Sequence, residues 1–159
     1  MLTHSFKNIT PNKYYADLLQ DAYAGKHGES KMFLQFLYFS YVLCNFDKEF
    51  ADCFCLIAKE DIEHHNLLGE IIVKLGGDPL YVSSKNIAMS FAEIEALKSL
   101  KQIINLGIEL KEKTIIDYKI LLAKIAEKEI KNILEILISD EQKHKEMLEN
   151  LLKKYQNNY

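Results

Sequence analysis

The sequence predicts an all-α protein, a bundle of four long helices arranged as two helical hairpins that one long crossover joins. Four long segments carry helix start or stop signals together with helical apolar periodicity. None of the chain alternates apolar and polar residues as a half-buried strand does. The two halves also resemble each other at a constant offset in the numbering, which indicates that one hairpin repeats the other.

The first hairpin is expected to contain helices over about residues 12–43 and 48–75. Asp47 is a good N-cap for the second of them, because its side chain can accept a hydrogen bond from a free backbone N–H group of the first turn. Gly76 and Gly77 end this helix, since glycine readily adopts the backbone conformation of a helix C-terminus.

The second hairpin is expected to contain helices over about residues 91–125 and 127–155. Ser90 and Glu93 have the spacing of a capping box, which predicts a helix start beside them. The crossover between the hairpins then spans about residues 76–90. Together the elements form one domain over residues 1–159, a length typical of a single domain.

Composition and charge argue against several classes of partner. The net charge is −3 and no basic face stands out, so no nucleic acid partner is expected. Neither an N-terminal signal nor a run of about 18 apolar residues is present, so we expect a cytoplasmic protein without a membrane partner. Cys44, Cys53 and Cys55 lack the spacing of a metal knuckle and are expected to be buried, reduced thiols.

The internal repeat includes residues that bind metals. An offset of 80 in the numbering relates Glu29 to Glu109, Asp61 to Glu141, His64 to His144 and Glu60 to Asp140. The single glutamate and the acidic residue of the motif are equally far apart in both halves, and the predicted turn lies midway between them. Because a helix rises about 1.5 Å per residue, four acidic side chains are expected at one level of the bundle.

These polar residues interrupt apolar helix faces rather than solvated ones. Asp61 and His64 divide the apolar stripe of the second helix, and Glu141 and His144 divide that of the fourth. Four carboxylates in an apolar interior need compensating charge. Two divalent cations would supply it, and oxygen-rich ligands with one imidazole per ion suit iron or manganese better than structural zinc.

Simpler interpretations account for single residues but not for the joint pattern. Glu141 and His144 alone would more often lie on a solvated face, and His64 alone would more often be a partly buried histidine. Two motifs, two single carboxylates, one offset and matched heights together favour the metal site. Tyr38 and Tyr118 also obey the offset, but each lies about half a turn from its glutamate, so neither is expected at the metals.

The motifs resemble those of a known superfamily. Glu29, Asp61-Ile62-Glu63-His64, Glu109 and Glu141-Gln142-Lys143-His144 are similar to the ligand motifs of ferritin-like di-iron carboxylate proteins. The resemblance covers about residues 14–155, and residues 67–79 resemble small rubrerythrin-like proteins. It implies a ferritin-like four-helix bundle with two iron or manganese ions. In it, Glu29 and Glu109 would be terminal ligands, Asp61 and Glu141 bridges, and His64 and His144 caps.

Two residues differ from the family pattern, and a third matches an additional ligand of rubrerythrins. Asp61 stands where the family has a longer glutamate, which weakens one bridge between the metals. Ile62 stands where bacterioferritins carry the methionine that binds haem, so no haem is expected. Glu112 matches an extra glutamate ligand of rubrerythrins, and it is either a seventh ligand or the ion-pair partner of a neighbouring lysine, Lys111 or Lys113.

The function that the resemblance implies is a redox enzyme that reduces hydrogen peroxide or dioxygen. No rubredoxin domain follows the bundle, so an external electron donor is expected, and the family favours a homodimer. Two alternatives remain open. One is a ferroxidase with iron storage, which needs a cage of many subunits. The other is a degenerate, non-catalytic bundle that has lost a metal through Asp61.

Overall fold

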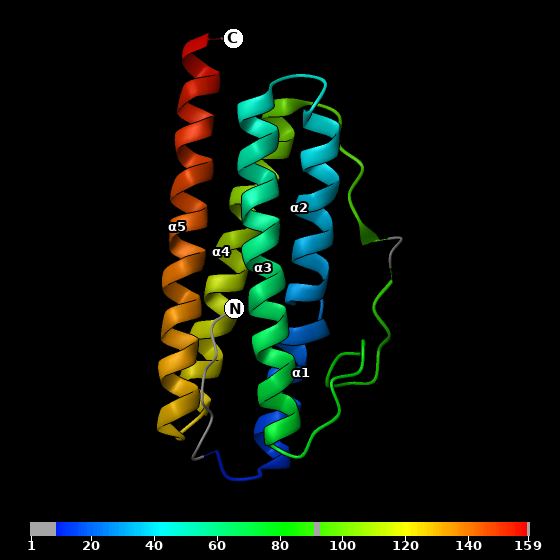
Figure 1. Cartoon of the computed structure of the whole chain (residues 1–159), viewed down its shortest axis with the longest axis vertical. Coiled ribbons are helices and arrows are strands. Elements are labelled where there is room, and N and C mark those ends of the chain that lie inside the picture. Colours follow the sequence, from blue (N-terminus) through cyan, green and yellow to red (C-terminus); the bar gives the residue numbers. More distant parts are fainter. Residues whose placement is uncertain (1–8, 91–92, 159) are drawn as a thin grey trace.

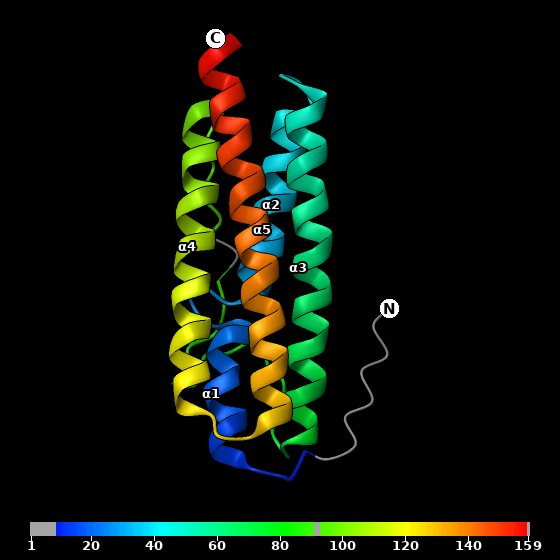
Figure 2. The ribbon, with the colours of Figure 1, turned by 90° about the vertical axis from the view of Figure 1, so that its left-hand side faces the viewer.

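The computed structural model describes residues 9–90 and 93–158 and contains a long helical bundle (Figure 1). Its helices are α1 (Lys13–Ala24), α2 (Glu29–Leu43), α3 (Lys48–Lys74), α4 (Leu100–Lys124) and α5 (Lys128–Asn158). Helices α1 and α2 follow one another along the same side of the bundle, where together they act as its first long helix (Figures 1 and 2). The predicted bundle of two hairpins joined by one long crossover is therefore confirmed.

The first predicted helix, residues 12–43, is divided in two at Gly25 and Gly28. A Cβ atom on Gly28 would lie only 2.8 Å from the carbonyl oxygen of Asp21, and one on Gly25 would lie closer still, so the chain folds back too tightly for a side chain. Ser30 Oγ spans the break and donates to the Tyr23 carbonyl at 2.7 Å. As a result, a new helix begins at Glu29.

Helix α3 begins as predicted, because the Asp47 side chain accepts a hydrogen bond from the Glu49 N–H group at 2.8 Å. Helix α4 instead begins at Leu100, and the start predicted near residue 91 is wrong for the described part of this segment, which excludes residues 91–92. The buried Gln35 side chain binds both the N–H and the C=O of Glu95, at 2.7 and 3.1 Å. These bonds hold the end of the crossover outside the helix.

Two apolar clusters fill the bundle, one toward each end. One contains Leu19, Leu68 and Ile130, and the other contains Phe36 and Phe54. Along α3, α4 and α5, buried polar residues separate the two clusters. The middle of the bundle is thus a polar layer with apolar packing above and below it.

The structure bears on the expectations about the cysteines and about membrane spans. Cys44 is exposed and Cys53 and Cys55 are partly buried, so the prediction of three buried thiols is wrong. Within residues 9–90 and 93–158, no helix combines the length and the apolar character that a membrane span requires.

Candidate metal centre

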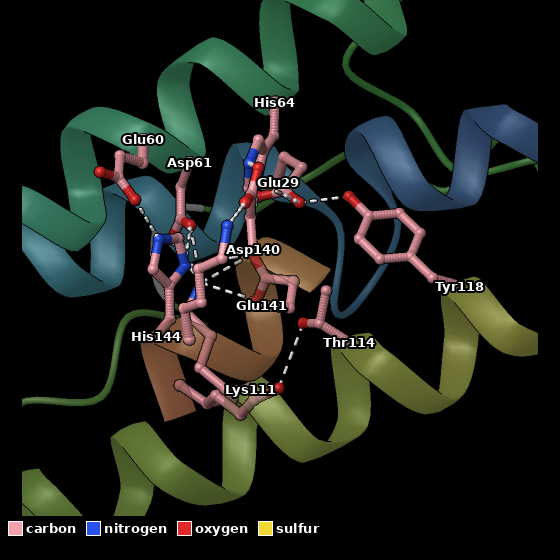
Figure 3. Close-up of polar contacts among 12 residues, drawn as sticks. Glu29, Glu60, Asp61, His64, Lys111, Thr114, Tyr118, Asp140, Glu141 and His144 are labelled. Atoms are coloured by element: carbon pink, nitrogen blue, oxygen red, sulfur yellow. Dashed lines mark hydrogen bonds and ion pairs between the residues drawn. The ribbon is translucent and has the colours of Figure 1, made fainter. Parts of the chain in front are cut away.

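Five of the predicted site residues meet in the polar layer at the middle of the bundle (Figure 3). They are Glu29 from α2, Asp61 and His64 from α3, and Glu141 and His144 from α5. His64 is 6% exposed and the other four are fully buried. One ligand atom from each of Glu29, Asp61, His64 and Glu141 lies within 4.8 Å of all the others. These four atoms are therefore close enough to share one ion.

The two histidines turn the same ring nitrogen toward the cluster. His64 Nδ1 lies 3.3 Å from Glu141 Oε1 and 3.6 Å from Glu29 Oε1. His144 Nδ1 lies 3.4 Å from Glu141 Oε1 and 3.5 Å from Asp61 Oδ1. Neither Nδ1 atom has a hydrogen-bond partner, and neither does Glu29 Oε2. Buried polar atoms without a partner are costly, and a cation bound beside His64 would satisfy two of them, His64 Nδ1 and Glu29 Oε2.

The outer nitrogen of each histidine faces a carboxylate from the other hairpin. His64 Nε2 lies 3.6 Å from Asp140 Oδ2, and His144 Nε2 lies 2.5 Å from Glu60 Oε2. The repeat offset relates these two acidic residues to each other, so the repeat seen in the sequence is also a repeat of contacts. A carboxylate behind an imidazole is typical of metal-binding histidines, because it orients the ring and raises its basicity.

Helix α4 contributes Tyr118, which the sequence did not place here. Tyr118 is 1% exposed, and its hydroxyl donates a hydrogen bond to Glu29 Oε1 (Figure 3). Burial raises the pKa of Tyr118 well above its ordinary value, and the nearby carboxylate of Glu29 raises it further. The hydroxyl therefore keeps its proton and remains a donor. The expectation that Tyr118 lies away from the site is wrong.

Helix α4 also contributes a buried lysine, Lys111, which sequence reasoning considered only as a partner of Glu112. Its ammonium group lies 2.7 and 2.8 Å from the two Asp61 oxygens and 2.9 Å from Glu141 Oε2. The group also lies 4.8 Å from the centre of the Phe36 ring, and the residue is fully buried. Lys111 is thus a permanent positive charge inside the cluster.

A signal for Lys111 and Tyr118 was present in the sequence. Gly107, Lys111, Thr114 and Tyr118 recur at helical spacing and are all buried in the structure. They continue the apolar face that Ile104 begins. Following this face along α4, rather than the repeat offset, would have found both residues.

The structure does not bring Glu109 or Glu112 to the cluster. The Glu109 side chain is 57% exposed and pairs with Lys113 at 2.5 Å, and the Glu112 side chain is 50% exposed and pairs with Lys145 at 2.8 Å. Glu109 precedes Lys111 by two positions, which is about 200° around the helix, so both cannot face the interior. The seven-residue ligand set predicted from the sequence is therefore only partly assembled.

The charges inside the cluster shift the pKa values of its members. Burial raises the pKa of Asp61 to about 7, even though the Lys111 ammonium lowers it. Burial also acts on Glu141, but Lys111 and the two histidines outweigh it and hold the pKa of that carboxyl well below its usual range. Burial opposes a proton on His64, yet the pKa of His64 is raised because Asp140, Glu141 and Glu29 surround it. Without a metal, protons on imidazole help to balance the carboxylates.

A family model described as Rubrerythrin matches residues 17–152. The chain belongs to the rubrerythrin family. The resemblance to ferritin-like proteins that its motifs suggested is thereby confirmed. No match was found among curated proteins.

Solved structures similar to this rubrerythrin-family chain share its fold. The manganese catalase KatB from Anabaena PCC7120 has a TM-score of 0.88 and 19% identity, over 98% of this chain and 81% of that one. The Desulfovibrio desulfuricans bacterioferritin, described with a diiron site, has a TM-score of 0.79 and 22% identity, over 91% and 81%. The Rhodobacter capsulatus bacterioferritin, described with a metal-free dinuclear site and haem iron, has a TM-score of 0.75 and 17% identity, over 94% and 89%.

In this rubrerythrin-family chain, the residues around His64 fit one divalent metal ion. Glu29, Glu141 and His64 offer two carboxylates and an imidazole nitrogen without a hydrogen-bond partner, in a buried place. Such a mixture of oxygen and nitrogen ligands suits iron or manganese. On the other side, beside Asp61 and His144, the ammonium group of Lys111 already supplies a cation.

Proposed function

We propose that this chain is a metal-dependent redox protein that reduces hydrogen peroxide or dioxygen to water with electrons from an external donor. The observation that carries the proposal is the buried cluster of Glu29, Asp61, His64 and Glu141, whose ligand atoms lie within 4.8 Å of one another. Iron or manganese fits this ligand set, and either ion would supply the electron transfer. Each molecule of peroxide takes up two electrons and two protons and yields two molecules of water.

The chain's own residues prepare the site for this chemistry. Asp140 faces the outer nitrogen of His64 and holds the ring so that its inner nitrogen points at the carboxylates. Tyr118 donates to one oxygen of Glu29, and the other oxygen has no hydrogen-bond partner. Because the Tyr118 hydroxyl keeps its proton, it holds Glu29 Oε1 in place as a hydrogen-bond donor.

A cavity that Tyr118 lines lies next to the candidate site. It has a volume of about 390 Å³ and lies between α1, α4 and crossover residues such as Ser83. Tyr118 lines this cavity and also contacts Glu29. A small oxidant bound in the cavity would therefore lie beside Tyr118, whose hydroxyl is hydrogen-bonded to a candidate ligand.

The proposal is tested by loading the purified chain with Fe(II) under anaerobic conditions, or with Mn(II), and following peroxide consumption in the presence of a reductant. We expect turnover by the loaded protein and none by the metal-free protein. Glu29→Gln removes a buried candidate ligand and is expected to abolish turnover. Glu109→Gln, on the surface of α4, is the matched control and is expected to retain it. Absence of turnover in a fully loaded sample would contradict the proposal.

One observation favours a second function, a non-catalytic ferritin-like bundle. Lys111 binds both oxygens of Asp61, so part of the cluster is neutralised without any metal. In this case the bundle would serve as a structural or interaction module. Metal analysis separates the two functions, since the non-catalytic bundle would hold well below one metal ion per chain even after loading.

A further inference from the structure

We infer that the Lys111 ammonium group takes the place of a second metal ion, so that the centre binds one divalent ion rather than two. The ion binds on the side of Glu29, His64 and Glu141, and Lys111 neutralises the side of Asp61. This inference rests on the proposed metal site and adds the number of ions and their position. Two ions were expected from the sequence because Glu109 was expected as a fourth carboxylate.

The contacts of Lys111 are those of a bound cation rather than of an incidental neighbour. Its nitrogen is held by both oxygens of Asp61, at 2.7 and 2.8 Å, and by Glu141 Oε2 at 2.9 Å. Asp61 and Glu141 are the two residues that were predicted to bridge a metal pair. The ammonium group therefore contacts both of the carboxylates that were expected to bridge two metals (Figure 3).

The charge of the cluster fits one divalent ion. Glu29, Asp61 and Glu141 are the carboxylates buried in it, and Lys111 balances one of the three. A single divalent ion balances the other two and leaves both imidazoles neutral, which is the form that binds metals. A second divalent ion beside the ammonium would leave two positive charges unbalanced in a buried place, which is strongly unfavourable.

The half of the centre around His64 and the half around His144 differ in their carboxylates. The half with His64 keeps its terminal carboxylate, because Glu29 is fully buried. The half with His144 lacks one, because Glu109 lies on the surface and pairs with Lys113. The shorter side chain of Asp61 is also on this half, where it meets the long lysine side chain. These differences disfavour a metal beside His144, whereas Glu29, Glu141 and the unpartnered Nδ1 atom of His64 remain on the other side.

Lys111 cannot be displaced easily by an arriving metal. It is fully buried, and its ammonium group lies over the Phe36 ring at 4.8 Å from the ring centre. Its neighbours along α4, Thr114 and Tyr118, face the interior with it. Moving the ammonium group out would break its contacts with both Asp61 oxygens and with Glu141 Oε2 and leave those buried carboxylates without a positive partner.

The experiment is a titration of the metal-free chain with Mn(II) by equilibrium dialysis, followed by elemental analysis and electron paramagnetic resonance. We expect the wild-type chain to saturate at one ion with the spectrum of an isolated Mn(II). Lys111→Glu restores a fourth carboxylate and is expected to raise the capacity to two ions with a spin-coupled spectrum. Lys113→Glu makes the same charge change at an exposed position of α4 and is expected to leave the capacity at one.

The outcomes separate this inference from the proposed function. Two coupled ions in the wild-type chain would overturn the inference and leave the proposed redox function standing. No bound ion in the wild-type chain would overturn the metal site itself. If Lys111→Glu folds only with Mn(II) present, its capacity is measured after refolding with the ion, and a value of one would overturn the inference.

Discussion

His144 Nε2 lies 2.5 Å from Glu60 Oε2, and the internal repeat maps this pair onto His64 and Asp140, whose corresponding atoms lie 3.6 Å apart. Each hairpin thus orients the histidine of the other. Both contacts join a histidine nitrogen to a carboxylate oxygen, but Lys111 adds a positive charge only to the half of the centre that contains His144. Comparing them tests which half binds the metal.

We expect Asp140→Asn to weaken Mn(II) binding by about 10–100-fold, because it removes the carboxylate that orients His64. Glu60→Gln makes the equivalent change behind His144 and is expected to weaken binding by less than about threefold, because Lys111 neutralises that side. Both affinities can be measured by calorimetric titration. Equal losses for the two variants would show that both histidines bind metal.

Tyr118→Phe is expected to destabilise the metal-free protein by about 1–3 kcal/mol, because it leaves a buried Glu29 oxygen without its hydrogen-bond donor. Urea unfolding measures this loss. Tyr14 is 60% exposed, so Tyr14→Phe is a matched control that should change stability by less than about 0.5 kcal/mol. A Tyr118→Phe variant as stable as the control would contradict the contact with Glu29.

Metal affinity is expected to rise with pH. Burial opposes a proton on His64, but the carboxylates around it raise its pKa well above the ordinary value, so the metal-free ring keeps its proton to a higher pH than a free imidazole does. A metal can bind only after this proton leaves, and the apparent dissociation constant should fall by up to about tenfold per pH unit below the pKa. Mn(II) titrations at pH 6, 7 and 8 measure the trend. An affinity independent of pH would show that His64 is not a ligand.

Gly28→Ala is expected to disturb both the fold and the site. The added Cβ would lie 2.8 Å from the Asp21 carbonyl oxygen, so the turn between α1 and α2 must shift. Such crowding costs about 1–3 kcal/mol, and it moves Glu29, the next residue in the chain. Thermal unfolding and Mn(II) affinity should both decrease. A variant that is destabilised but binds Mn(II) normally would show that the turn does not position Glu29.

Much of this architecture is determined by the sequence alone. Helical periodicity and the Asp47 cap are local properties, so the course of α3 was predictable from its own residues. The internal repeat also predicted where the polar residues lie along the bundle axis, because the rise of a helix is constant. Glu29, Asp61, His64, Glu141 and His144 were all predicted at one level and do meet there.

Other features depend on contacts between segments far apart in the chain. The start of α4 at Leu100 depends on Gln35, which binds the backbone of Glu95 from a different helix. The break before α2 depends on a turn so tight that Cβ atoms at Gly25 and Gly28 would meet Asp21. The residues before Leu100 give no sign of the contact with Gln35, and those around Gly28 give no sign of how closely the turn packs against Asp21.

The most consequential difference is the rotation of α4 about its own axis. The internal repeat placed Glu109 at the correct height, but height along a helix says nothing about which residues face inward. Packing decides that, and the face that buries Ile104, Gly107 and Tyr118 brings Lys111 inward and leaves Glu109 in water. The sequence therefore determined the bundle and the level of its polar layer, whereas the tertiary structure decided that one of the expected carboxylates is replaced by an ammonium group.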